Sequence, residues 1–201
     1  KNDATIYLMH SMEMPLHLAV DGDKGQLPEA LFFMKMAENR FAELMQKPFL
    51  EDVKVQDIIA QGELYKDMQL VVGKHDIDLI VMGSHGASGF QEMFIGSNAE
   101  KVVRTSEIPV LVIKNAHEEF ELTDLVFACD LSEECKKPFV NAMRFANAFG
   151  ATTHLLYINT PSGFKTTSQT RDMLHNFVHG TAADNYTLNV YNDLSVEKGV
   201  L

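Results

Sequence analysis

The sequence predicts an α/β protein built on a doubly wound parallel sheet. Three observations lead to this fold class: short apolar runs typical of parallel strands covered on both faces, segments of helical periodicity between them, and glycines where a strand gives way to a helix. Strands that alternate with helices in this way imply right-handed crossover connections. At 201 residues and 46% hydrophobic content, the chain can bury one substantial core or parts of two.

The first half of the chain alternates strands and helices. Pro28 fits the first turn of the first helix, where a missing N–H costs no hydrogen bond. Gly62 separates the second strand from the second helix, and Pro109 ends the third helix. The elements expected here are strands at Ala4–His10, Val53–Ala60, Asp78–Met82 and Val110–Ile113, and helices at Leu27–Gln46, at Glu63–Lys74 and from Ser97 onward.

The second half repeats this pattern. From Asn115 a polar, acidic stretch predicts a linker, so two domains are expected, residues 1–115 and 116–201. The segment at Ala151 (ATTHLLYIN) echoes the segment at Ala4 (ATIYLMHSM), which indicates a tandem of α/β domains. The elements expected here are strands at Thr123–Cys129, Ala151–Asn159 and Tyr186–Asn192, a helix that opens at Asp130 and is capped by Gly150, and a helix from about Ser168 to His179.

Ile77–Lys114 carries the strongest functional signal, because it reads strand, glycine-punctuated loop, helix, strand. The glycines after the strand are Gly83, Gly86, Gly89 and Gly96. Glycines at such a junction let backbone N–H groups approach a bulky anion that Cβ atoms would exclude. Ser97 and Glu100 have capping-box spacing, and the first turn of that helix would offer N–H groups and a positive dipole end to phosphate. The spacing is neither a P-loop nor G-x-G-x-x-G, so tight turns without a ligand remain the alternative.

The full motif, Gly83-x2-Gly86-x9-Gly96-Ser97 inside IDLIVMGSHG…GS…PVLVIK, resembles the nucleotide-binding signature of the universal stress protein family. The resemblance implies a nucleotide α-hydrolase-like sheet of strand order 3-2-1-4-5. It also implies an adenine nucleotide, ATP or AMP with Mg²⁺, as cofactor. The glycines and the Gly-Ser pair hold the phosphates and ribose in the family's ATP-binding members, which implies nucleotide-binding roles here for Met82, Gly83, Gly86, Gly96, Ser97 and Asn98.

The resemblance adds two positions on the adenine side. Ser11 stands where the family places a small apolar residue against the adenine. Asp130 matches the acidic residue that ends the family's first strand and contacts the adenine end of the nucleotide. Ala128 and Cys129 replace the Pro-Thr that usually precedes this acidic residue.

Both repeats are incomplete by this resemblance, since the first begins at its second strand and the second breaks off before its glycine loop. Two explanations stay open. The sequence can be part of a longer tandem protein, or the strand Thr123–Cys129 can fill the vacant central position between the strands at Ala4 and Asp78. In the second case Asp130 would complete the nucleotide site with Gly83 and Gly86. A sheet without its central strand would leave two edges unpaired.

Composition and motifs narrow the function classes further. A formal charge of −11 argues against a nucleic-acid partner, and no apolar run approaches the roughly 20 residues that span a bilayer. Two cysteines suit a reducing cytoplasm rather than a disulfide framework. Core methionines are favoured over a soft-metal site at residues 9–17, and a surface pair over a metal site at His175 and His179. No catalytic motif is found, so no catalytic or metal residues are assigned.

The favoured function is therefore a cytoplasmic universal-stress-type protein that binds an adenine nucleotide as a regulatory ligand, with at most slow hydrolysis. An alternative is an interaction and dimerisation module that binds no nucleotide, and a slow ATP-hydrolysing enzyme is the third candidate. Val110–Ile113 is expected at a sheet edge, which favours a homodimer or pseudo-dimer through that strand.

Overall fold

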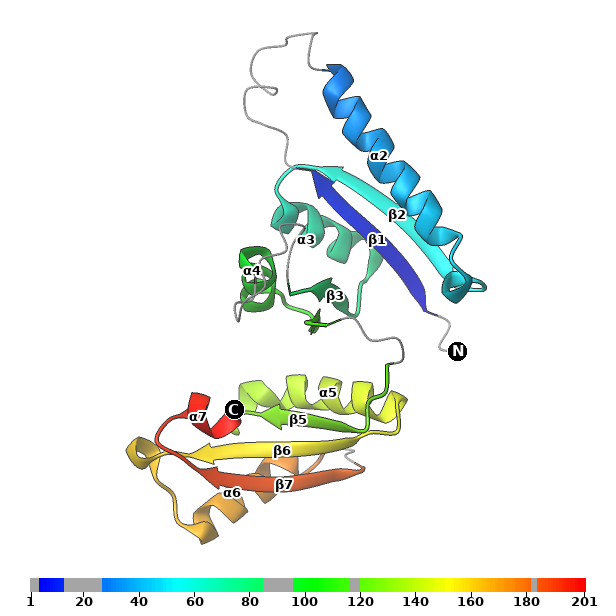
Figure 1. Cartoon of the computed structure of the whole chain (residues 1–201). Helices are drawn as coiled ribbons and strands as arrows, with labels where there is room; N and C mark the ends of the chain where they lie inside the picture. The colour runs from blue at the N-terminus through cyan, green and yellow to red at the C-terminus, as the bar shows by residue number, and fades with distance from the viewer. Residues whose placement is uncertain (1–3, 13–26, 85–95, 116–119, 182–183) are drawn as a thin grey trace. The chain divides into compact units, whose positions relative to one another are not determined.

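The chain divides into two units, Lys1–Lys114 and Asn115–Leu201, in the computed structural model (Figure 1). The structure describes residues 4–12, 27–84, 96–115, 120–181 and 184–201. All strand pairings among them are parallel, and helices connect the strands in both units. The α/β fold class with parallel strands is therefore confirmed.

The first unit holds its described strands as two separate pairs. Its elements are β1 (Thr5–Met12), α2 (Leu27–Met45), a 3-10 turn (Pro48–Leu50), β2 (Lys54–Gln61), α3 (Leu64–His75), β3 (Ile80–Gly83), α4 (Ser97–Thr105) and β4 (Val110–Ile113). β1 pairs with β2 and β3 pairs with β4, and these pairs are neighbours in the predicted order 3-2-1-4-5. That order is not seen as one continuous sheet in either unit, so it stays a prediction.

The helix α3 covers one face of β1. The ring centroids of Tyr7 on β1 and His75 on α3 lie 4.5 Å apart, and the hydroxyl of Ser11 reaches Asp67 on α3. Tyr7 and Ser11 share this face because alternate residues of a strand point the same way. Few side chains in the unit are fully covered; the described residues classed as buried are Ala37, Met68, Ser84, Ala99 and Val102.

The second unit is a three-stranded sheet of order β5-β6-β7 (Figure 1). Its elements are β5 (Asp124–Ala128), a 3-10 turn (Glu133–Cys135), α5 (Lys136–Ala148), β6 (Thr152–Asn159), a 3-10 turn (Pro161–Gly163), α6 (Thr167–Val178), β7 (Tyr186–Asn192) and α7 (Val196–Val200). β5 pairs with β6, so the strand expected at Thr123–Cys129 is a member of the second unit's own sheet. Its hypothesised place in the sheet of the first unit gains no support from this pairing.

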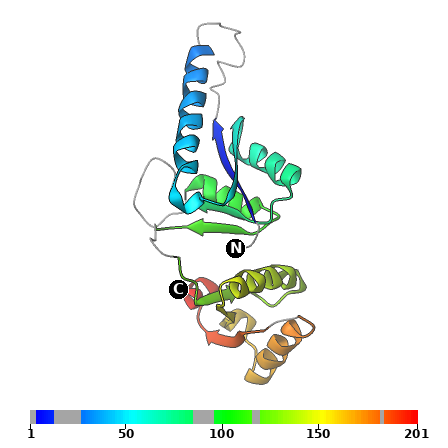
Figure 2. The ribbon, with the colours of Figure 1, turned by 90° about the vertical axis from the view of Figure 1, so that its right-hand side faces the viewer.

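The core of the second unit lies between its sheet and two helices. Phe139 of α5 is fully buried, and its ring centroid lies 5.4 Å from that of Phe177 on α6. Leu155 of β6 completes the centre of this cluster. The short helix α7 packs on the other face, where a Cβ on Gly199 would lie 2.6 Å from the side chain of Ile158. Figure 2 shows α5 and α6 on one side of the strands and α7 on the other, the arrangement of a doubly wound sheet.

The helix expected from Asp130 begins later, at Lys136. The carboxylate of Asp130 accepts a hydrogen bond from the N–H of Ser132 at 2.9 Å, which forms a tight turn. Leu131 has a φ of 62°, in the left-handed region that a right-handed helix cannot contain. Gly150, with a φ of 74°, follows the end of α5 as the sequence predicts.

Candidate functional site

The ends of the glycine loop are tied together by backbone hydrogen bonds. The N–H of Ser84, which follows β3, donates to the C=O of Ile113 at 2.9 Å and so extends the β3–β4 pairing by one residue. The N–H of Gly96 donates to the C=O of Ser84 at 2.7 Å. This second bond fixes the start of α4 beside the carboxyl end of β3. Helix N-termini at this edge of a parallel sheet are where α/β folds bind anions.

The N-terminus of α4 differs from the predicted capping box. Gly96 is the N-cap residue and Ser97 is the first residue inside the helix. Because glycine has no side chain, the N-cap residue makes no side-chain hydrogen bond to the first turn. The carboxylate of Glu100 instead contacts Arg104 at 3.3 Å, one turn along α4. The predicted cap role of Ser97 is therefore wrong, because the helix begins one residue earlier than the box requires. A glycine cap leaves the first-turn N–H groups without a side-chain acceptor from that position.

Two buried side chains hold α4 in place below its exposed first turn. Ala99 and Val102 are 2% and 1% exposed, whereas Ser97 and Asn98 are exposed. The structure thus gathers most of the predicted loop residues at one end of β3 and α4, namely Met82, Gly83, Gly96, Ser97 and Asn98. Gly86 lies outside the described residues, so its role stays a prediction.

Ser11 is engaged by a neighbour within the protein. Its hydroxyl lies 2.7 Å from a carboxylate oxygen of Asp67, in the first turn of α3, and 3.5 Å from the C=O of Gly62. A Cβ built on Gly62 would lie 2.8 Å from that same carboxylate, so any other residue there would force the carboxylate to shift. The expected contact between Ser11 and adenine stays a prediction, and the hydroxyl already has a protein acceptor.

An ion pair and a hydrogen bond join the segment of α3 to that of α4. The ammonium of Lys101 lies 2.7 Å from the carboxylate of Glu63, the residue before α3, and Lys66 lies 3.0 Å from the same carboxylate. Hydrogen bonding to Lys101 and Lys66 lowers the pKa of Glu63 to about 2. The hydroxyl of Tyr65 donates to the C=O of Thr105 at 3.1 Å. The helix that carries the candidate phosphate site is thereby fastened to its neighbour at two points.

Asp130 belongs to the second unit, directly after β5. Its carboxylate accepts hydrogen bonds from the N–H of Ser132 at 2.9 Å and from the thiol of Cys135 at 3.4 Å. The bonds from Ser132 and Cys135 lower the pKa of Asp130. Burial raises the pKa of the neighbouring Cys129 thiol to about 11, which keeps that thiol protonated. The contact of Asp130 with a nucleotide stays a prediction.

Within the described ranges, no group of three or more His, Cys, Asp or Glu side chains is placed to hold a metal ion. None of the helices in those ranges combines the length and the apolar content needed to cross a bilayer.

Comparison with known protein families settles the family. The model of the universal stress protein family matches residues 1–114. The chain belongs to this family. Among curated universal stress proteins of Methanocaldococcus jannaschii, MJ0577 is 38% identical over 80 residues, which cover 39% of this chain and 48% of MJ0577. MJ0531 is 32% identical over 97 residues, which cover 48% of this chain and 50% of MJ0531. This universal stress protein thus spans about half the length of these curated relatives.

Solved structures agree on the fold. A universal stress protein from Archaeoglobus fulgidus aligns with a TM-score of 0.65 and 20% identity, over 94% of this chain and 66% of that one. The functionally unknown protein PA1789 from Pseudomonas aeruginosa aligns with a TM-score of 0.57 and 15% identity, over 94% of this chain and 64% of that one. At these identities the likeness establishes the universal stress fold alone.

Several contacts of the site in this universal stress protein were not found from the sequence. Asp67 is 56 residues from its partner Ser11, and Lys101 is 38 residues from Glu63. Such pairs depend on how helices and strands pack, and single-sequence patterns carry no signal for them. The one available hint was Gly62, because a glycine directly before a helix indicates a close approach of another group.

Proposed function

We propose that this universal stress protein binds an adenine nucleotide, ATP or AMP with Mg²⁺, at its glycine loop and uses it as a regulatory ligand in a stress response. The observation that carries the proposal is the 2.7 Å hydrogen bond from Gly96 to Ser84, which sets the exposed first turn of α4 beside the end of β3. That turn offers backbone N–H groups and a positive dipole end to a phosphate. The family's nucleotide-binding motif, retained here as Gly83-x2-Gly86-x9-Gly96-Ser97, supports the same ligand.

The residues around this turn fit a phosphate group. Gly83 and Gly96 add no Cβ atoms at the two ends of the loop, and Ser97 and Asn98 are exposed. The ammonium of Lys101 is held by Glu63, so the backbone is the main source of positive potential here. Mg²⁺ would be bound chiefly through the nucleotide's own phosphates, since the described residues offer no cluster of carboxylates.

The nucleotide would act as a ligand rather than as a substrate under turnover. Phosphoryl transfer needs a metal clamp and a positioned base or water, and the sequence carries no recognised catalytic motif that would supply them. We therefore infer a regulatory protein whose hydrolysis of ATP is slow at most. A cytoplasmic location is part of the proposal, because Cys129 and Cys135 are free thiols, as in reducing compartments.

The test introduces a negative charge where the phosphate would bind. Ser97→Glu should leave α4 folded, because acidic residues at a helix N-terminus are stabilising, but should weaken Mg-ATP binding by at least about tenfold. Thr167→Glu is the matched control, since it adds the same charge at the first residue of α6. Binding is measured by calorimetry, and co-purified nucleotide is identified by ion-exchange chromatography after denaturation. Wild-type protein that neither carries nor binds an adenine nucleotide would refute the proposal.

A second candidate function is an interaction module that works through its strand edges. β4 has a single hydrogen-bonded neighbour, β3, among the described strands. The C=O groups of Pro109 and Ile113 accept hydrogen bonds from Ile80 of β3 and from Ser84. Strand alternation therefore turns the N–H groups of Val110 and Val112 toward the open edge. An apolar edge strand of this kind supports the homodimer or pseudo-dimer through Val110–Ile113.

The dimer is tested at Val112. Val112→Pro removes an edge N–H while leaving the bonds to β3 in place, and should convert a dimer into a 22.5 kDa monomer in light-scattering measurements. Val112→Thr is the control, because it keeps the N–H and the β-branched shape. A wild-type protein that is monomeric at every concentration would rule out the edge-strand dimer.

A further inference from the structure

The second unit contains a cleft of its own, lined by residues outside the glycine loop. Its volume is about 1110 Å³, and it lies between α6, the end of β7 and the loop after β6. The carboxyl ends of β6 and β7 open into it, at Asn159 and Asn192. Parallel α/β sheets bind ligands outside the carboxyl ends of their strands. A cleft of this size at this position can hold a small organic molecule.

The frame of the cleft is rigidly hydrogen-bonded. Asn159 is 5% exposed, and its carboxamide donates to the C=O of Lys165 at 3.1 Å and to the side chain of Asn192 at 2.9 Å. Its oxygen accepts from the N–H of Lys165 at 2.9 Å. These bonds fix the loop after β6 against the end of β7. The cleft is therefore formed before any ligand arrives, which lowers the cost of binding.

Apolar side chains line part of the cleft. Leu174 of α6 is 3% exposed and forms part of its floor, and Val190 of β7, 37% exposed, forms part of its wall. Two large side chains stand at the rim, Phe164 at 66% and Leu194 at 74% exposed. An apolar ligand body placed between them would cover surface that water now contacts.

The ionisable side chains of the cleft are mostly basic. Lys165, Arg171 and His175 line it, with Asp193 as the acidic residue at its β7 side. Within the described residues none of the three basic side chains takes part in an ion pair. Three basic side chains that line one cleft and make no ion pair with other described residues are unexpected in a chain of net charge −11.

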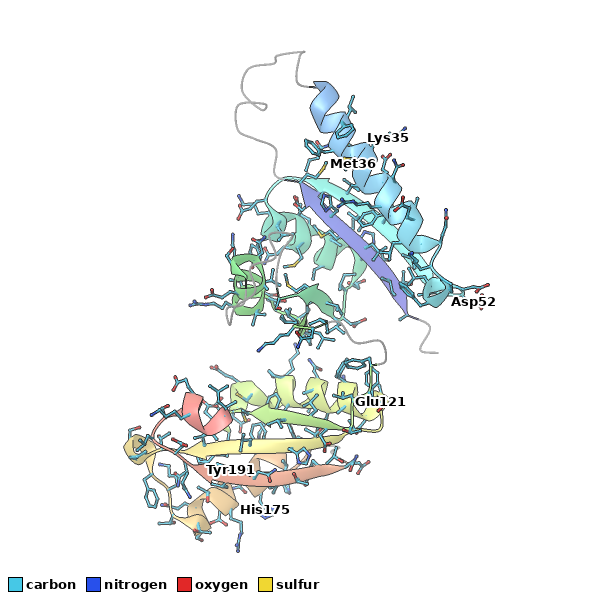
Figure 3. All side chains as sticks on the ribbon, in the orientation of Figure 1. Lys35, Met36, Asp52, Glu121, His175 and Tyr191 are labelled. Atoms are coloured by element: carbon cyan, nitrogen blue, oxygen red, sulfur yellow. The ribbon has the colours of Figure 1, made fainter. Side chains whose placement is uncertain are left out.

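The basic side chains, rather than the helix end, supply this positive charge. Thr166 and Gln169 form a capping box that satisfies the N-terminus of α6 with its own side chains. Arg171 and His175 stand one turn apart along α6 and share a face of the helix (Figure 3 labels His175). Arginine so placed can bind a carboxylate or phosphate through two parallel hydrogen bonds.

We propose that this cleft binds a small organic anion with an apolar body. The carboxylate or phosphate headgroup lies at Arg171 and His175, and the apolar body lies over Leu174 and between Phe164 and Leu194. Asp193 keeps the headgroup on the α6 side of the cleft by charge repulsion. No residue that lines this cleft belongs to the glycine loop, so the proposal would stand if the nucleotide proposal failed.

The experiment compares two fluorescent probes that differ in charge. The full chain is titrated with 8-anilinonaphthalene-1-sulfonate, which carries an anionic group, and with uncharged N-phenyl-1-naphthylamine. We expect saturable one-to-one binding of the sulfonate, and Arg171→Gln should weaken it by about tenfold while changing the uncharged probe less than about twofold. Arg144→Gln, which removes an exposed arginine of α5 outside the cleft, is the control for charge.

A second variant tests the apolar part. Leu194→Ser should weaken both probes by about threefold or more, whereas Leu70→Ser should weaken neither. Leu70 is 72% exposed on α3, nearly the same exposure as Leu194, so both variants should fold. Circular dichroism of each variant verifies this.

Competition then identifies the headgroup. Displacement of the sulfonate probe by decanoate assigns a carboxylate ligand, and displacement by decyl phosphate assigns a phosphate ligand. The amides that the sulfonate probe perturbs are mapped by NMR chemical-shift changes and should lie around the cleft. The proposal is overturned if those amides lie elsewhere, if neither decanoate nor decyl phosphate displaces the probe, or if Arg171→Gln and Arg144→Gln bind the sulfonate alike.

Discussion

The contact between Gly62, Asp67 and Ser11 allows a sharp test of how β1 is held to α3. Replacing Gly62 by Ala places a methyl group 2.8 Å from the Asp67 carboxylate, closer than real Cβ contacts come. The carboxylate must shift, and we expect it to lose its 2.7 Å hydrogen bond from Ser11. Hydrogen bonds to charged groups contribute about 1.5–3 kcal/mol, and we expect the low end here because water reaches these half-buried groups.

Two effects of opposite sign act in Gly62→Ala. The lost hydrogen bond destabilises, but Gly→Ala at an unstrained position stabilises by about 0.4–1 kcal/mol through the unfolded chain. Gly62 is not among the glycines with positive φ, so the second effect applies to it. We therefore expect a net loss of about 0.5–1.5 kcal/mol in the wild-type background. In the Ser11→Ala background the bond is already absent, and the same substitution should become neutral or stabilising.

The assay is the free energy of unfolding from urea denaturation of the four proteins of this double-mutant cycle. Gly73→Ala is the reference, because a Cβ there meets nothing within 4 Å and should simply stabilise α3. The expected coupling energy is about 1–2 kcal/mol. Equal effects of Gly62→Ala with and without the Ser11 hydroxyl would refute the reasoning.

Three other outcomes are expected. Phe139→Leu removes two ring contacts, at 5.3 and 5.4 Å, and should cost about 1–3 kcal/mol by urea denaturation, against less than about 0.5 kcal/mol for the exposed Phe164→Leu. The pKa of Glu63 is lowered from 4.5 to about 2, so its ion pair contributes fully above pH 4.5 and is lost as the pH falls through about 2. The difference in free energy of unfolding between wild type and Glu63→Gln should shrink as the pH falls from 4.5 to about 2. A difference that stays constant over this range would contradict the prediction. Gly199→Ala forces a Cβ to within 2.6 Å of Ile158 and should cost about 1–3 kcal/mol, with faster amide exchange in α7 as the direct sign.

The regular elements could be predicted because their signals are local. β4 and β7 have the predicted bounds, Val110–Ile113 and Tyr186–Asn192. In β4 an uninterrupted run of branched apolar residues follows Pro109, so both its type and its start are encoded within a few residues. Helix α3 was shifted by one residue at each end from the expected Glu63–Lys74, which is within the usual uncertainty of helix ends.

The missed features depend on geometry that sequence spacing does not determine. Ser97 and Glu100 have the spacing of a capping box, but the bond between Gly96 and Ser84 places the helix start one residue earlier. Asp130 and Ser132 were read as a helix start, yet the left-handed conformation of Leu131 delays α5. The cleft of the second unit was also not predicted, because Arg171 and Asn159 converge only once α6 has packed beside β7.

The bond between Gly96 and Ser84 also bears on how this fold can diversify. It joins the two ends of the intervening segment through backbone groups alone, so the bond itself requires no particular side chain between them. Doubling the length of a pinned loop costs only about 0.6 kcal/mol of closure entropy. Segments of other lengths and compositions could therefore be exchanged at this junction, and the chain could acquire a new ligand preference without altering the framework that presents it.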